Sequence, residues 1–163
     1  MLTTRWVKTA MVGSCALFAL LVAFNNLVYY GSNYEFVRHT LSMDTTFPGN
    51  VLMGRAITSP TLWTLAYWLI IATEAVTGLL LGFGALRLAL ALREPAGRFN
   101  AAKSAIALGV GLGFLLWCTG FMIIGGEWFG MWQSKDWNGV PSAFRFDVVL
   151  LLVLIFVMQN DGD

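Results

Sequence analysis

The stretch that decides the fold reads TLWTLAYWLIIATEAVTGLLLGFGAL from Thr61 to Leu86, followed after a short basic connection by SAIALGVGLGFLLWCTGFMIIGG from Ser104 to Gly126. Both segments are almost entirely apolar. Each exceeds the roughly 20 residues that a helix needs to cross the hydrocarbon core of a bilayer. They predict two transmembrane helices joined as an antiparallel hairpin.

Two further apolar segments flank this hairpin, one from Trp6 to Val28 and one from Ala143 to Met158. Of the 163 residues, 58% are hydrophobic and 12% are charged, whereas a soluble domain carries about 25% charged residues. The net charge of +1 offers no electrostatic attraction for nucleic acid. The sequence therefore predicts an all-α, polytopic membrane protein. It forms a single four-helix transmembrane domain, with spans at residues 6–28, 61–86, 104–126 and 143–158.

The loop Gly31–Pro60 between the first two spans carries the signature of a short helix. Ser32 and Glu35 fit the S-x-x-E pattern of a capping box, in which two side chains satisfy the free amides at a helix start. Apolar residues then recur at helical spacing from Tyr34 to Leu41. We expect a short amphipathic helix that lies at the membrane surface.

The distribution of basic residues predicts the orientation, because segments rich in lysine and arginine stay in the cytoplasm. Six basic residues lie in the short N-terminal segment and in the connection between the central spans: Arg5, Lys8, Arg87, Arg93, Arg98 and Lys103. Four lie on the other side: Arg38, Arg55, Lys135 and Arg145. We therefore expect both termini in the cytoplasm and both long loops on the outer side.

Small residues in the two central spans predict where these helices touch. Gly78 and Gly82 form a G-x-x-x-G pair in the span at residues 61–86, and Gly109 and Gly113 form another in the span at residues 104–126. Such pairs let helix backbones approach closely in lipid. In an antiparallel hairpin the two pairs lie at matching depth, so we expect them to form one close contact.

Glu74 is the strongest single indication of function, because an ionisable residue inside a spanning helix is costly and is a functional hypothesis by default. The antiparallel register brings it level with Trp117, whose indole N–H can donate to the carboxyl. One interpretation is an acid that binds a proton or another cation. The other is a neutral, hydrogen-bonded acid that holds the hairpin together. The sequence favours the second, because it shows no further ionisable residue at that depth.

A second group of polar residues falls at the outer ends of the spans: Asn25, Asn26, Glu127, Arg145 and Asp147. Their shared depth allows them to converge on a small site for a lipid headgroup, an ion or a partner. The alternative is a network that ties the helix ends together, with Glu127 paired to Arg145.

The loop at residues 127–139 is rich in tryptophan and contains Trp128, Trp132 and Trp137. Tryptophan concentrates at membrane interfaces and in the energetically dominant part of protein interfaces. We expect this loop either to anchor the protein in the interface or to dock a partner.

Several chemistries find no support in the sequence. The single histidine, His39, cannot supply bis-histidine haem ligation or a histidine-rich metal site. Cys15 and Cys118 both lie in apolar spans and form no Cys-x-x-Cys pair. No nucleotide-binding or zinc-protease motif is present. The sequence therefore predicts no catalytic residue, no metal and no cofactor, and it leaves open a haem or quinone shared with another subunit at an interface.

Two stretches resemble a known family. One runs from Asn25 to Asp44 and includes FVRH at residues 36–39, and the other begins with GGEWF at Gly125 and continues to Gly139. Both are similar to a bacterial family described only as predicted small integral membrane proteins, a domain of unknown function, and the resemblance covers nearly the whole chain. It implies a four-helix protein of the bacterial inner (plasma) membrane. It implies no activity for any residue.

Three functional hypotheses follow. The first is a non-enzymatic accessory or assembly subunit of a larger bacterial membrane complex, with membrane lipids and other integral membrane subunits as partners. The second is a small proton- or ion-coupled transporter or channel component that uses Glu74. The third is a lipid-modifying enzyme at the face of Glu127, Asp136 and Asp147.

Overall fold

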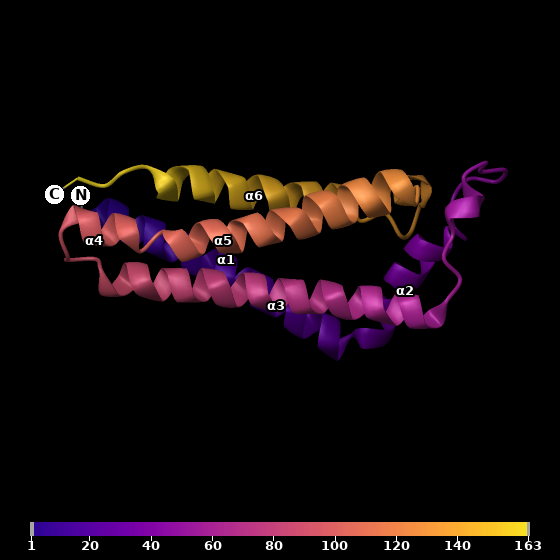
Figure 1. Ribbon diagram of the computed structural model, residues 1–163, viewed down its shortest axis with the longest axis horizontal. Helices are drawn as coiled ribbons and strands as arrows, with labels where there is room; N and C mark the ends of the chain where they lie inside the picture. The colour runs from indigo at the N-terminus through magenta and orange to yellow at the C-terminus, as the bar shows by residue number, and fades with distance from the viewer. Residues whose placement is uncertain (1, 163) are drawn as a thin grey trace.

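Four long helices dominate the computed structural model, which describes residues 2–162 (Figure 1). All four are long and apolar enough to cross a membrane, and no strand occurs in the described part of the chain. The predicted all-α, four-span fold is therefore confirmed. The spans are α1 (Leu2–Val28), α3 (Pro60–Leu90), a third made of α4 (Ala96–Ala101), α5 (Ser104–Phe114) and the π-helix η2 (Leu115–Trp128), and α6 (Val140–Met158).

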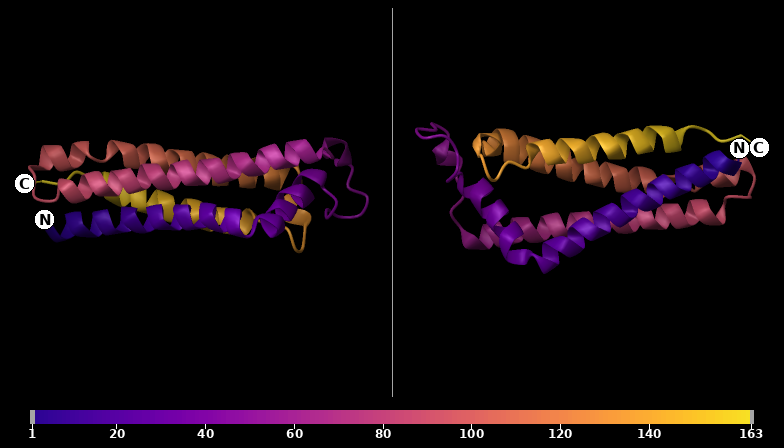
Figure 2. Two further views of the ribbon diagram at one scale, coloured as in Figure 1. Left: turned by 90° about the horizontal axis from the view of Figure 1, so that it is seen from below. Right: turned by 180° about the vertical axis from the view of Figure 1, so that it is seen from behind.

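Successive spans run in opposite directions, so both termini lie at one end of the bundle, on the left of Figure 1. We call this the terminal end. The opposite end, the loop end, carries α2 (Tyr30–Ser42) and two single 3-10 turns, η1 (Met53–Arg55) and η3 (Met131–Gln133). Figure 2 shows the same arrangement from below and from behind.

Helix α2 begins almost where α1 ends, and it leaves α1 at a sharp angle (Figure 2). Its first residue is Tyr30, so Ser32 and Glu35 lie inside the helix, and no side chain caps its start. The predicted capping box is wrong. The carboxylate of Glu35 instead accepts a hydrogen bond from Arg38, one turn further along.

The glycines of α3 pack mainly against α1. A Cβ at Gly78 would lie 2.6 Å from Cγ of Leu20, and a Cβ at Gly82 would lie 3.9 Å from Cβ of Ala16. Helices α1 and α3 make the most extensive contact between any two elements of the fold. The first G-x-x-x-G pair therefore serves the α1–α3 contact, and the expected contact between the two glycine pairs is wrong.

A different set of residues joins α3 to α5. Gly84, which lies outside the predicted row, faces Ile106 so closely that a Cβ there would lie 2.5 Å from Cγ1 of Ile106. A Cβ at Gly109 would lie 3.0 Å from Leu81. Gly113 is surrounded by side chains of α3, η2 and α6. In this hairpin, side chains of one helix thus pack against glycines of the other, and the glycines do not face one another.

The third span changes its winding at Leu115, where the α-helix gives way to the π-helix η2. π-Helices are rare and are frequent at functional sites. An apolar run in a membrane suits both helix types, so the sequence of this span does not reveal the change. It predicts an ordinary α-helix throughout. Beyond the change, η2 presents Trp117 and Phe121 to the interior of the loop-end half.

At the terminal end, basic residues that count toward the predicted orientation form a buried network. Nζ of Lys8 and Nζ of Lys103 each lie 2.7 Å from Oδ2 of Asp161. The guanidinium of Arg5 donates to three backbone carbonyls from the α3–α4 connection and the C-terminal tail. Burial raises the pKa of Asp161, but the hydrogen bonds from Lys103 and Lys8 outweigh it and hold that pKa below its ordinary value. This network fastens the tail beyond α6 across the end of the bundle.

Candidate functional site

Glu74 lies on the face of α3 that points into the bundle, and it is 2% exposed. Its Oε2 accepts a hydrogen bond of 2.7 Å from Nδ2 of Asn26 on α1. The backbone carbonyl of Asn26 accepts a second hydrogen bond, of 2.6 Å, from the hydroxyl of Tyr67. Tyr67 stands two helical turns before Glu74 on α3, so the same face supplies both groups. The other carboxyl oxygen of Glu74 makes no hydrogen bond to any residue from 2 to 162.

A cavity of about 290 Å³, which we call the polar cavity, lies against this trio. It is lined by residues of α1, α2, α3 and η2 and by the start of α6, and it is partly open. Its polar lining residues share hydrogen-bonding side chains and extend from Glu74 toward the loop end: Asn26, Asn33, Tyr67, Glu74, Trp117, Asn138 and Ser142. The cavity therefore connects a buried acid with the loop end of the bundle.

The angle between α1 and α2 explains why this space exists. Asn26 stands two residues before the end of α1, yet it meets Glu74, which lies fourteen residues after the start of α3. Helix α1 therefore ends well short of the loop end, and α2 turns aside to pack on α3 through Val37, Tyr67 and Ile71. The loop-end half of the bundle thus lacks a continuous first helix beside α3.

Trp117 lines the polar cavity, but it makes no hydrogen bond to Glu74, so the predicted hydrogen bond between them is wrong. Its ring packs between Phe146, with centroids 5.5 Å apart, and Phe18, with centroids 6.3 Å apart. The carboxyl bonds Asn26 instead, so Glu74 ties α1 to α3 rather than closing the hairpin of the two central spans. The sequence places Trp117 at the correct depth but assigns Glu74 the wrong partner.

This arrangement suits the binding of a proton or another cation. A buried carboxylate is costly unless a positive charge or a proton compensates it, and residues 2–162 provide no ion pair for Glu74. Within the described residues, what is left to compensate this charge is a proton on the carboxyl or a cation in the adjacent cavity. Aromatic rings in the lining add attraction for a cation that lies over their faces. Here those rings belong to Phe36, Tyr67, Trp117, Phe121 and Phe146.

The predicted outer polar cluster does not come together as one site. Asn25, Glu127 and Arg145 are exposed, and Arg145 donates to the neighbouring residues Pro141 and Ser142 of its own helix. Within the described chain Glu127 forms no ion pair with Arg145. Two members of the predicted cluster therefore point inward instead: Asn26 binds Glu74, and Asp147 is buried.

Asp147 is a second acid inside the bundle. It is 3% exposed, and neither of its carboxyl oxygens has a hydrogen-bond partner among residues 2–162. It does not line the polar cavity, although its neighbour Phe146 does. The sequence places Asp147 near the outer end of the fourth span, as part of the outer polar cluster, whereas in the structure its side chain is buried within the bundle. Because Asp147 is buried while Glu127 is exposed, these two acids do not share the face required by the lipid-enzyme hypothesis.

The tryptophan loop packs onto the first long loop. The guanidinium of Arg55 lies 4.3 Å from the ring centroid of Trp128 and donates to the Trp128 carbonyl. Phe47 meets Trp132 edge-on, with centroids 5.7 Å apart, and the backbone N–H of Phe47 donates to Gln133. Trp128 and Trp132 nonetheless stay 54% and 49% exposed. We call this exposed and internally supported surface the aromatic cap.

Trp137 has a different role, because it covers α2. Its ring stacks on His39, with centroids 4.6 Å apart. Nδ1 of His39 lies 2.7 Å from Oδ1 of Asp44, and Arg38 also reaches Asp44. Burial raises the pKa of Asp44, but the hydrogen bond with His39 and the charges of His39 and Arg38 outweigh it, so the pKa lies below its ordinary value. Trp137 and this charged cluster hold α2 against the last loop.

The sequence reading missed Asn33, Tyr67 and Asn138 as lining residues. For Tyr67 a signal existed, since a residue seven positions before Glu74 lies on the same helical face. Asn33 lies in α2 and Asn138 in the loop before α6, and the sequence predicts both segments as polar loops, where an asparagine carries no such signal. Among the described residues no group of three or more His, Cys, Asp and Glu side chains is placed to hold a metal ion.

Comparison with known proteins agrees with this architecture. The family model described as "Predicted small integral membrane protein (DUF2165)" matches residues 4–160. No curated protein and no solved structure matched the chain. Because the matched region covers nearly all of the sequence, the chain belongs to this family of small integral membrane proteins.

Proposed function

We propose that this small integral membrane protein binds a cation, either a proton or a small organic cation, at Glu74, and that it works as a component of a membrane transport system. The observation that carries the proposal is the buried carboxyl of Glu74. It has one oxygen held by Asn26, no charged partner among the described residues, and a polar cavity beside it that leads toward the loop end. An ionisable residue inside a membrane span generally marks such a pathway.

Access to Glu74 is one-sided in this conformation. Between Glu74 and the terminal end the bundle is filled by fully buried apolar side chains, among them Val12, Leu81, Leu88 and Ile106. The buried network around Asp161 then closes the terminal end itself. A binding site open toward one end and sealed toward the other is what a single state of an alternating-access protein presents.

Proton release tests the proposal. If one carboxyl takes either a proton or a cation, tetraethylammonium added to the purified protein in neutral detergent should displace protons, up to about one per chain. A weakly buffered solution with a pH indicator measures this release. Glu74→Gln keeps the shape and hydrogen-bonding capacity of the side chain, and it should abolish the release while the protein stays folded.

Asp147→Asn is the matched control, because it neutralises another buried acid that does not line the cavity. It should release protons as the unmodified protein does. Equal release from Glu74→Gln and the unmodified protein would sink the proposal, and so would no release from either. The same variants in liposomes, followed by a pH-sensitive dye, show whether binding leads to flux.

A second candidate function, an accessory subunit that docks onto other integral membrane proteins, is favoured by the aromatic cap. Trp128 and Trp132 are exposed, yet Arg55 and Phe47 hold both rings in place. Preordered tryptophan and arginine side chains are the commonest centres of binding energy in protein interfaces.

The test replaces both cap tryptophans with alanine and measures the size of the complex extracted from native membranes. A smaller complex is expected if the cap docks a partner. Trp6→Ala, at an exposed tryptophan near the opposite end of the bundle, is the control and should leave the size unchanged. An unchanged size for the double cap variant would remove the docking role.

A further inference from the structure

A second cavity, which we call the apolar groove, lies beside the polar cavity in the loop-end half of the bundle. Its volume is about 360 Å³, and its lining comes mainly from α2, α3 and η2, with Leu112 of α5, Phe129 and Met131 completing it. Most lining side chains are aliphatic or aromatic, and none of them is charged. Leu69 of α3 and Leu115 and Ile124 of η2 line it while remaining 68%, 58% and 46% exposed. The groove therefore opens between α3 and η2, on the side where lipid chains would lie.

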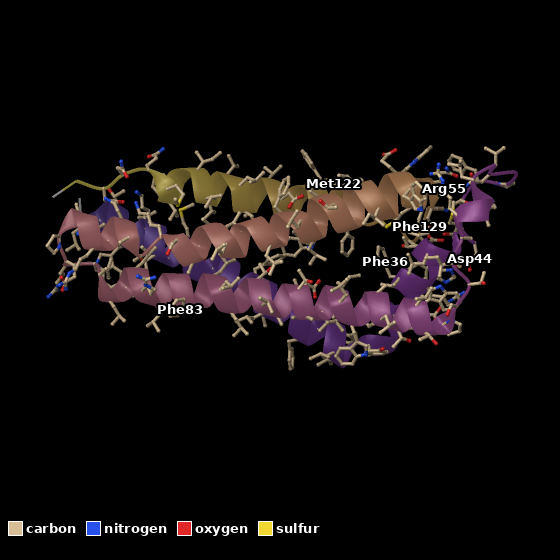
Figure 3. The ribbon with its side chains drawn as sticks, in the orientation of Figure 1. Phe36, Asp44, Arg55, Phe83, Met122 and Phe129 are labelled. Carbon is tan, nitrogen blue, oxygen red and sulfur yellow. The ribbon has the colours of Figure 1, made fainter. Side chains whose placement is uncertain are left out.

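The two cavities share one wall. Four residues line both of them: Phe36 and Val37 of α2, Ile70 of α3 and Phe121 of η2. Phe36 and Phe121 stack with ring centroids 6.0 Å apart. Figure 3 shows Phe36 at the loop end, in the space between α3 and η2. Aromatic side chains turn about two torsions without backbone movement, so these two rings can shift while α2 and η2 stay in place.

Charge decides what the joined space can hold. Among the described residues lining either cavity, Glu74 is the one with a charged side chain. A phosphate or sulfate headgroup would meet a carboxylate of like sign in a site of low dielectric, which is strongly unfavourable. An ammonium would instead neutralise Glu74 and lie among the rings of Tyr67 and Trp117, which attract cations.

We propose that the polar cavity and the apolar groove form one site for a single-chain amphiphile with an amine or quaternary ammonium head. The head lies at Glu74 and Asn26, and the hydrocarbon chain passes between Phe36 and Phe121 into the groove. The proposal rests on the cation binding proposed above and adds the class of ligand. The combined space lies within the roughly 300–1,000 Å³ common for small-molecule sites. Entry is lateral, from the bilayer, through the opening between α3 and η2.

The test is equilibrium binding of radiolabelled dodecyltrimethylammonium to the protein in phosphatidylcholine nanodiscs, with binding to empty nanodiscs subtracted. Saturable binding near one molecule per chain is expected. Glu74→Gln should weaken it by about tenfold or more, as expected when the charged partner of a bound ion is removed. Unlabelled dodecanol and dodecyl sulfate, which share the chain but lack the cation, should compete poorly.

Gly120→Leu tests the groove separately. Gly120 lines only the groove, and a Cβ there would lie 3.7 Å from its nearest neighbour, Leu116, so the new side chain has room to extend into the empty space. This variant should weaken dodecyltrimethylammonium binding by about tenfold, since the chain loses its place, while tetraethylammonium still releases protons. Gly111→Leu adds the same side chain to the same span, at a position where no described atom outside the adjacent residues and the helix's own backbone lies within 4 Å of the Cβ, and it should change neither result. If Gly120→Leu fails to fold, Thr119→Leu fills the same groove.

Two results would overturn the amphiphile site. One is unchanged binding of the long-chain amine by the groove variant, and the other is equal competition by dodecanol, which would make the groove a general lipid contact. Either result leaves the cation site standing if tetraethylammonium still releases protons in a Glu74-dependent way. If tetraethylammonium releases no protons from the unmodified protein, the cation binding on which both proposals depend is wrong.

Discussion

Gly78→Ala should destabilise the protein, because it inserts a methyl group where α1 and α3 touch. The new Cβ would lie 2.6 Å from Cγ and 3.0 Å from the backbone nitrogen of Leu20, so one of the two helices must move. Overpacking of this kind costs about 1–3 kcal/mol. The higher helix propensity of alanine returns about 0.5–1 kcal/mol. The balance is a loss of up to about 2.5 kcal/mol in the free energy of unfolding, with a central value of about 1 kcal/mol.

Gly111→Ala is the control for this measurement. It makes the same exchange in another spanning helix, but beyond the adjacent residues and the helix's own backbone no described atom lies within 4 Å of a Cβ there. Only the propensity gain remains, so its stability should equal or exceed that of the unmodified protein. Both variants are unfolded in mixed micelles with rising mole fraction of sodium dodecyl sulfate and followed by circular dichroism. A Gly78→Ala protein as stable as Gly111→Ala would contradict the packing described here.

Leu20→Ala in the Gly78→Ala background identifies the partner helix. Removing most of the Leu20 side chain relieves the closest contacts but not the one to the backbone nitrogen, so part of the lost stability should return. The expected double-mutant coupling is about 0.5–1 kcal/mol, as for other residues in contact. The contact between the two glycine pairs that the sequence predicts would give no coupling between Gly78 and Leu20. Additive losses would therefore favour that contact.

Three further predictions concern other parts of the fold. Asp161→Asn leaves two buried lysines without their carboxylate and should free the C-terminal tail for carboxypeptidase digestion, whereas Asp136→Asn, in an exposed loop, should not. The folded pKa of Asp161 lies below its ordinary value of about 4. Its contribution to the stability of the docked tail is therefore present above about pH 4 and is lost as the pH falls through the folded pKa. Acid should free the tail too. Tyr67→Phe removes the hydrogen bond to the Asn26 carbonyl and should lower the free energy of unfolding by about 1 kcal/mol in the same micelle assay. Reporter fusions after Ala96 and at the C-terminus should both read cytoplasmic, and an export signal from either would reverse the predicted orientation.

The sequence predicts the spans well but the contacts between them poorly, and the reason is geometric. Hydropathy is a one-dimensional signal, so it places helices along the chain and along the membrane normal. Each residue advances a helix by about 100°, which puts Gly84 roughly 240° around α3 from Gly78. The sequence therefore shows that these two glycines face different neighbours. It does not show which neighbour is α1 and which is α5, so the predicted contact of Gly78 with the third span is wrong.

The same limit explains how Glu74 was matched with the wrong partner. The sequence predicts that Asn25 and Asn26 form the polar end of a span, and this prediction gives their depth correctly. Adjacent residues on a helix, however, point about 100° apart. One is exposed, and the other reaches Glu74 from α1. Tyr67 and Glu74 already marked a polar face on α3 through their spacing of seven. A polar face on a spanning helix requires a polar partner or a cavity. In this protein the early end of α1 provides both, because it brings Asn26 to the acid and leaves the space beside it unfilled.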